Sequence, residues 1–167
     1  KNNFYFFLKK YRTDFRLSIK DEIPKEYLYV LSDFQKKLLL PQFDSFNQRQ
    51  LERINKSKYY YYKLKNIKEF SFPQIDFNSK NIFIDFPILV KKNKDKLISY
   101  LMDRNIDIKD YYYSNCGEDI LYSKFIFKNV INSKAIVREI IMLPVGQNIN
   151  KKYQDTIIQE INNFVKK

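Results

Sequence analysis

Few side chains in this sequence have the type and spacing that chemistry requires. The chain contains no histidine and a single cysteine, Cys116, which is followed by Gly117. Without histidine the chain cannot form a Ser-His-Asp triad, a histidine acid–base catalyst or a histidine metal site. A nucleophilic Cys116 would need activation by a lysine or by a helix N-terminus, so an inert cysteine is the favoured interpretation. We therefore predict no catalytic residue in this chain.

The acidic and lysine side chains show no arrangement that points to a reaction. Glu118 and Asp119 are adjacent, and adjacent side chains diverge in most backbones, so a solvated loop is favoured over an acid–base pair. A lysine forms a Schiff base only in an apolar pocket, and the sequence does not reveal one. The two glycines, Gly117 and Gly146, are too few for a phosphate-binding loop or a dinucleotide-binding turn. We predict no metal site either.

The net charge of +12 raises the question of an anionic partner. Only six of the 31 basic residues are arginines. Proteins that bind specific nucleic-acid sequences depend on arginine for bidentate contacts to the bases. The abundance of Lys, Asn, Ile, Tyr and Phe is typical of an A/T-rich genome, which explains the charge without a nucleic-acid partner. We therefore disfavour nucleic-acid binding.

The first residues combine aromatic and basic side chains. Residues 4–8 read Phe-Tyr-Phe-Phe-Leu, and the basic residues Lys9, Lys10, Arg12 and Arg16 follow. This pattern favours packing against a missing part of the protein, and a membrane-surface role stays open as a less favoured alternative. No segment has the roughly 20 apolar residues that span a bilayer. The unpaired cysteine suits a reducing compartment, so we predict a cytoplasmic location. We also expect the chain to be part of a longer product, because it begins with Lys1.

Two consecutive helices are predicted in the first half of the chain. Residues 32–35, Ser-Asp-Phe-Gln, fit a capping box, and the helix that they begin continues through Leu40. Pro41 is expected to kink or interrupt this helix, or to begin the next one. Apolar residues at three- and four-residue steps predict a second helix over 43–64, and residues 65–80 are expected to form a connector.

The second half of the chain alternates predicted strands and helices. Ile82, Ile84, Phe86, Ile88 and Val90 alternate strictly and predict a strand, in which Pro87 indicates an edge position or a bulge. Asn93 is expected to cap a helix that contains Leu97 to Met102, and Asn105 to follow it in a left-handed conformation. The remaining predicted elements are strands over 106–113 and 139–143, a short helix over 133–138, and a closing helix capped by Asn150 that ends near Val165.

These elements predict an α+β fold with a small sheet of about three strands, covered by helices and preceded by a long linking helix. We divide the chain into an aromatic and basic lead-in over 1–30, linking helices and a connector over 31–80, and a small α+β domain over 81–167.

Two segments of the chain resemble a known family. Residues 26–35, Glu-Tyr-Leu-Tyr-Val-Leu-Ser-Asp-Phe-Gln, are similar to the GYNYRLSDFQAALG segment of the DegT/DnrJ family of pyridoxal-phosphate-dependent sugar aminotransferases. The tail, residues 132–145 with the helix 150–165, resembles that family's closing strand and helix. The resemblance covers residues 26 to 167 in consistent order, and between the two segments it includes Arg53, 57–61, Leu64, Phe86–Val90, Asn105, Ile106 and 111–113.

The resemblance implies an aspartate-aminotransferase-like fold, with a large cofactor domain first and a small α+β domain last. This chain resembles the linking helix and the C-terminal small domain of such a type I aminotransferase. The family's catalytic lysine belongs to the large domain, so the resemblance implies pyridoxal phosphate in the full-length protein and none bound by this chain alone. It also implies a homodimer, a missing N-terminal cofactor domain, and a nucleotide-linked keto-sugar substrate for surface polysaccharide synthesis.

Three positions depart from the family pattern. Leu28 stands where the family has an asparagine that reaches the cofactor phosphate of the partner subunit, and Val30 where it has an arginine; Asn105 replaces a glycine. Tyr29 and Tyr112 keep family-like positions, and the resemblance makes them candidates for cofactor and substrate binding; buried aromatic packing is the favoured alternative for both. Because of Leu28 and Val30, a degenerate, non-catalytic binding or assembly module stays open as the alternative function.

Overall fold

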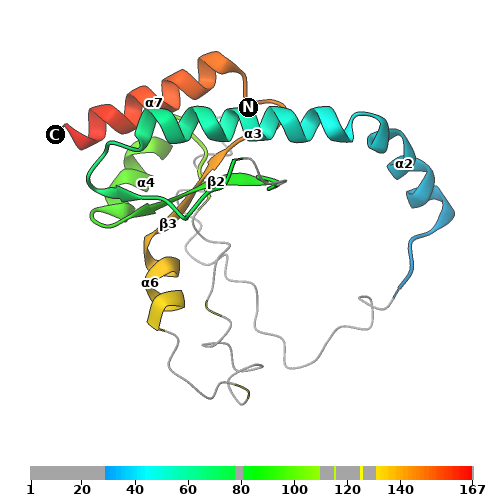
Figure 1. Ribbon diagram of the computed structural model, residues 1–167, viewed down its shortest axis with the longest axis horizontal. Coiled ribbons are helices and arrows are strands. Elements are labelled where there is room, and N and C mark those ends of the chain that lie inside the picture. Colours follow the sequence, from blue (N-terminus) through cyan, green and yellow to red (C-terminus); the bar gives the residue numbers. More distant parts are fainter. Residues whose placement is uncertain (1–28, 78–80, 110–114, 116–124, 126–130, 167) are drawn as a thin grey trace.

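The computed structural model describes residues 29–77, 81–109, 115, 125 and 131–166. These residues form an α+β fold with an antiparallel sheet in the order β1-β2-β3, which confirms the predicted fold class (Figure 1). The described elements are, in chain order, α2 (Asp33–Asp44), α3 (Phe46–Leu64), β1 (Phe70–Ser71), β2 (Asp85–Val90), α4 (Lys94–Met102), α6 (Ile131–Glu139), β3 (Ile140–Pro144) and α7 (Lys151–Val165).

Helix α2 begins at the predicted capping box. The Ser32 hydroxyl accepts a hydrogen bond from the Gln35 amide at 3.3 Å, and the Ser32 amide donates to Gln35 Oε1 at 2.8 Å. The helix continues through Pro41 and ends at Ser45, so the break before α3 comes later than the proline predicts. Helix α2 and the first half of α3 extend beyond the sheet as an arm (Figure 1).

One face of the sheet carries the hydrophobic core. Phe86 lies opposite Leu143 and Ile88 opposite Ile141, and all four side chains are fully buried. Helices α3, α4 and α7 cover this face with a second set of fully buried residues: Tyr60, Leu64, Leu97, Leu101, Ile157 and Ile161. The Tyr60 ring stacks on Phe86 with the centroids 5.8 Å apart, and burial raises the pKa of the Tyr60 hydroxyl, which donates to the Pro144 carbonyl.

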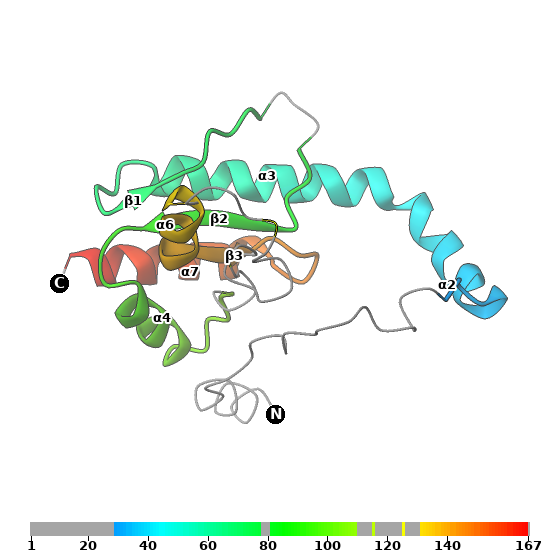
Figure 2. The same cartoon turned by 90° about the horizontal axis from the view of Figure 1, so that it is seen from below.

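The other face of the sheet contains Pro87, which lies in the central strand β2. Opposite it, Met142 exchanges both backbone hydrogen bonds with Lys109, at 3.2 and 2.8 Å, so its polar groups point away from Pro87. Strand β1 pairs only with Leu89 and Val90 of β2 and does not reach the proline. The predicted edge position is therefore wrong, because β2 is the central strand, but the missing N–H of Pro87 costs no hydrogen bond in the sheet. Helix α6 lies over this face (Figure 2).

Two of the predicted strands need correction. Strand β2 begins at Asp85, and Ile82 and Ile84 are 55% and 70% exposed, because β3 ends at Pro144 opposite Asp85 and leaves them without a ladder partner. The strand predicted over 106–113 is reduced, in its described part, to a bridge at Lys109. The third strand of the sheet is instead β1, which lies in the predicted connector.

The predicted helix caps are confirmed with one exception. Asn150 accepts a hydrogen bond from the Tyr153 amide at 2.9 Å, and Asn105 adopts the left-handed conformation with φ of 58°. Asn93 was expected to cap α4 with its side chain, and this is wrong: its φ is 59° and it makes no side-chain capping bond. A left-handed residue turns its side chain away from the helical amides that an N-cap must reach.

Candidate functional site

Of the two residues predicted to contact cofactor or substrate, the structure describes only Tyr29. Tyr29 precedes α2 and is 77% exposed, and the adjacent Val30 is also exposed. Tyr112 lies outside the described residues, as do Leu28 and Cys116.

Many large apolar side chains are exposed along the arm. Helix α2 buries none of its residues, and the exposed apolar side chains, here called the apolar arm surface, are Leu31, Phe34, Leu38, Leu39, Leu40, Phe43, Phe46 and Leu51. So many exposed apolar side chains in one segment are typical of a surface that contacts another protein. The arm is thus the part of the described chain that most clearly lacks a partner.

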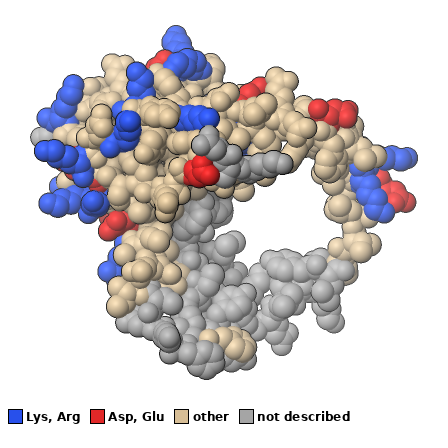
Figure 3. All heavy atoms as spheres, viewed as in Figure 1, with Lys and Arg blue, Asp and Glu red and all other residues tan. Residues whose placement is uncertain are grey.

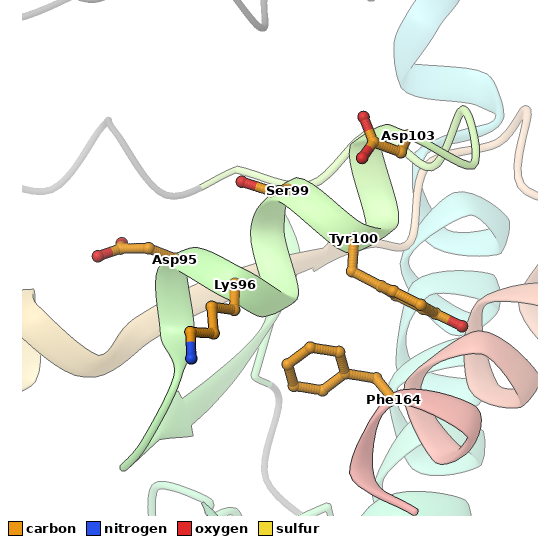
Figure 4. A pocket seen from close by; sticks show the side chains of 6 residues that line it. All are labelled: Asp95, Lys96, Ser99, Tyr100, Asp103 and Phe164. Carbon is orange, nitrogen blue, oxygen red and sulfur yellow. The ribbon is translucent and has the colours of Figure 1, made fainter. Parts of the chain in front are cut away.

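A shallow groove of about 450 Å³ lies between α4 and α7 (Figure 4). Its apolar wall is formed by Tyr100 and Phe164, whose ring centroids are 5.3 Å apart. The α4 side chains Asp95, Ser99 and Asp103 line the groove at four-residue spacing, together with Lys96. The sequence analysis did not find this groove, because a polar helix face at this spacing is usually a solvated surface.

Two polar contacts fix the tyrosine of the groove. The Tyr100 hydroxyl donates to Glu160 Oε2 at 2.8 Å, and Arg104 Nε forms an ion pair with the same oxygen at 2.9 Å while stacking on the Tyr100 ring. The hydrogen bond to Glu160 raises the pKa of Tyr100, because a carboxylate acceptor favours the protonated hydroxyl. The cluster joins α4 to α7 and does not supply a general base.

A second cluster joins α3 to α7. The Tyr59 hydroxyl donates to Asp155 Oδ1 at 2.5 Å, and Lys151 Nζ lies 3.2 Å from the same oxygen and over the Tyr59 ring. The hydrogen bond from Tyr59 lowers the pKa of Asp155, because it stabilises the carboxylate. This carboxylate is therefore ionised at neutral pH and serves as an acceptor between the two helices.

The lysine most closely paired with a buried acid is Lys109. Its Nζ lies 2.7 Å from Asp85 Oδ2, and Asp85 is 8% exposed. A Schiff base requires an amine that can approach a carbonyl group, whereas this amine is held against the Asp85 carboxylate. Lys109 is therefore a structural partner of Asp85.

The described residues include no metal-binding cluster, and the groove between α4 and α7 does not suit pyridoxal phosphate. No three histidine, cysteine or acidic residues within the described ranges lie close enough to hold a metal ion. The groove between α4 and α7 is lined by Asp95 and Asp103, which would repel the phosphate of the cofactor.

On the face shown in Figure 3, lysine and arginine side chains are scattered, with acidic side chains between them. Among the described helices, none is long and apolar enough to cross a membrane.

Comparison with known proteins places these features in a family. Residues 18–162 match the model of the DegT/DnrJ/EryC1/StrS aminotransferase family. The chain belongs to this family. The resemblance seen in the sequence is therefore confirmed, and with it the dependence of the family on pyridoxal phosphate. A comparison with curated protein sequences gives no match.

Solved aminotransferase structures share the fold. DesV of S. venezuelae, solved with a ketimine intermediate, is 16% identical, with a TM-score of 0.74 over 82% of this chain and 37% of its own. An aminotransferase of the same family from Brucella abortus is 21% identical, with a TM-score of 0.74 over 82% and 36%. An E. coli GDP-4-keto-6-deoxy-D-mannose-3-dehydratase with bound hydrated pyridoxal phosphate is 16% identical, with a TM-score of 0.61 over 72% and 33%. The chain thus spans little more than a third of the DesV and Brucella structures.

Proposed function

We propose that this chain is the C-terminal small-domain part of a sugar aminotransferase. The observation that carries the proposal is that the match covers most of this chain but only about a third of a solved family structure. The family model covers residues 18–162 of this chain, whereas the chain covers only 37% of DesV. In the complete protein, pyridoxal phosphate and its lysine would belong to a domain that precedes this chain.

The apolar arm surface supports a contact role for the chain in that protein. It would meet the N-terminal cofactor domain and a second subunit, so that the complete protein is a homodimer, while Tyr29 and Tyr112 form part of the wall of the substrate site. By family resemblance the substrate is a nucleotide-linked keto-sugar for surface polysaccharide synthesis, and the location is the cytoplasm. The chain would supply packing and shape, and no catalytic lysine.

A second candidate function is a non-catalytic binding or assembly module of the same fold. It is favoured by Leu28 and Val30, which stand where the family has an asparagine and an arginine. A hydrocarbon side chain can neither donate a hydrogen bond to a phosphate nor pair with an anionic substrate.

Reductive trapping of the cofactor distinguishes the two functions. The complete gene product would be incubated with pyridoxal phosphate, reduced with borohydride and mapped by peptide mass spectrometry. We expect a single labelled lysine N-terminal to Lys1, unchanged in the Lys109→Arg variant, which removes one amine of this chain and keeps its charge. A folded protein without any labelled lysine would favour the module, and a specific label within residues 1–167 would contradict both assignments.

A further inference from the structure

Three polar side chains occupy one face of α3 between its buried end and its exposed end. Gln50, Arg53 and Ser57 are three and four residues apart, so they continue the face on which Tyr60 and Leu64 enter the core. We call these three residues the α3 polar stripe. Gln50 Oε1, Arg53 Nε and Ser57 Oγ are all buried and form no hydrogen bond with any described residue, and Ser57 is fully buried.

Such atoms are uncommon in folded proteins. Burying a polar atom without a partner costs free energy, and native structures satisfy the great majority of buried donors and acceptors. Here three of them follow one another along a single helix face. This stretch of α3 therefore lacks a partner that would complete its hydrogen bonds.

Arg53 is the member of the stripe that can reach such a partner. Within the described residues its guanidinium group has neither an ion pair nor a hydrogen bond, and only its Nε is buried without a partner. Two other arginines are engaged: Arg104 pairs with Glu160, and Arg49 donates to the Gln42 carbonyl. Arg53 is half-buried, and the planar guanidinium group can bind a carboxylate in a bidentate manner.

We propose that Arg53 anchors a polypeptide surface that bears a carboxylate, and that this surface belongs to the cofactor-binding part of the complete protein. The inference rests on the proposed function. Phe46 of the apolar arm surface lies four residues before Gln50 and so continues the face of the polar stripe, and a polypeptide that covers Phe46 on this face also reaches Arg53.

Charge and apolar contact favour this occupant over two others. In the proposed homodimer, the partner subunit's copy of this chain carries the same net charge of +12, which disfavours it at Arg53 and leaves it to other parts of the arm. A free phosphate would satisfy Arg53, but it would leave the apolar side chain of Phe46 uncovered. A polypeptide supplies a carboxylate, amide donors and apolar contacts together.

The test introduces an amine at position 53 of the complete gene product. A carbodiimide joins an amine directly to a carboxylate with which it is in contact, so the Arg53→Lys variant would be treated with it and mapped by peptide mass spectrometry. We expect a cross-link between position 53 and an aspartate or glutamate N-terminal to Lys1. The matched control, Arg138→Lys, places an exposed amine on α6 and is expected to give no such cross-link.

Two results would overturn the proposal: no cross-link at position 53 beyond that of the control, or a cross-link only to a carboxylate within residues 1–167.

A second experiment uses the Arg53→Gln variant of the complete protein. We expect this variant to be cleaved faster by a protease between α2 and α3, whereas the Arg138→Gln control is not. Equal cleavage rates would also contradict the proposal. A cross-link to an N-terminal carboxylate in a protein without a borohydride-labelled lysine would uphold the contact and reject the enzyme.

Discussion

At the scale of single residues, asparagine fills the two positive-φ positions of the described non-glycine backbone, Asn93 and Asn105. Asn105 ends α4 in a Schellman motif: its amide donates to the Met102 carbonyl and the Ile106 amide to the Leu101 carbonyl, both at 3.0 Å. The sequence analysis predicted Asn105 correctly, but it assigned Asn93 to a side-chain cap. Asparagine favours both conformations, so its identity alone does not distinguish them.

The motif at Asn105 predicts a specific pattern of stabilities. Asn105→Ala is expected to lower the free energy of unfolding by about 1 kcal/mol, because a Cβ without a compensating polar group disfavours the left-handed region. Asn105→Gly, the matched control, is expected to leave it unchanged or slightly raised. Urea denaturation measures both variants, and equal destabilisation by alanine and glycine would show that backbone conformation is not the cause.

The hydrogen bond between Tyr59 and Asp155 predicts a titration effect. Removing the donor in Tyr59→Phe is expected to raise the pKa of Asp155 towards its ordinary value of 3.8, as measured by NMR titration of the carboxyl carbon. Because the pKa of Asp155 is lowered in the folded protein, its contribution to stability is present above pH 3.8 and is lost as the pH falls through the folded pKa. Tyr59→Phe should therefore weaken the loss of stability in acid. The exposed Tyr62 offers a control, since Tyr62→Phe should leave the titration of Asp155 as it is.

At the scale of elements, helix caps and alternating apolar residues predicted several elements that the structure contains. The capping residues Ser32 and Asn150 begin α2 and α7, and the alternation of Phe86, Ile88 and Val90 forms the core face of β2. Strand β1 is two residues long, which is too short for any alternation to be visible. Pairing partners set the ends of β2, so the equally apolar Ile82 and Ile84 could not be separated from it by pattern alone.

The two capped helices are expected to respond differently to loss of the cap. Asn150→Ala should lower the global free energy of unfolding by roughly 1 kcal/mol, because α7 buries Ile157, Ile158 and Ile161 in the core. Ser32→Ala should instead speed amide hydrogen exchange within α2 and leave global stability unchanged, because α2 buries no residue. Hydrogen exchange and urea denaturation together check both outcomes. A global loss in Ser32→Ala would mean that α2 packs more firmly than the structure shows.

At the scale of the whole molecule, the described residues form a packed α+β part and an arm (Figure 1), and the apolar side chains of the arm are exposed. The family and the fold class were accessible from sequence, because order along the chain and local patterns determine them. The site was less accessible. Tyr29 is exposed at the end of the arm, and the groove at Tyr100 and Phe164 depends on the contact between α4 and α7, which no local pattern encodes.

The central claim is that these residues complete a larger aminotransferase. The most direct test is the intact mass of the protein as its native gene produces it, measured by mass spectrometry. We predict a mass well above the 20.5 kDa of this chain, with the additional residues N-terminal to Lys1. A mass near 20.5 kDa would mean that the small domain exists alone, which would contradict the proposed aminotransferase and leave the non-catalytic module.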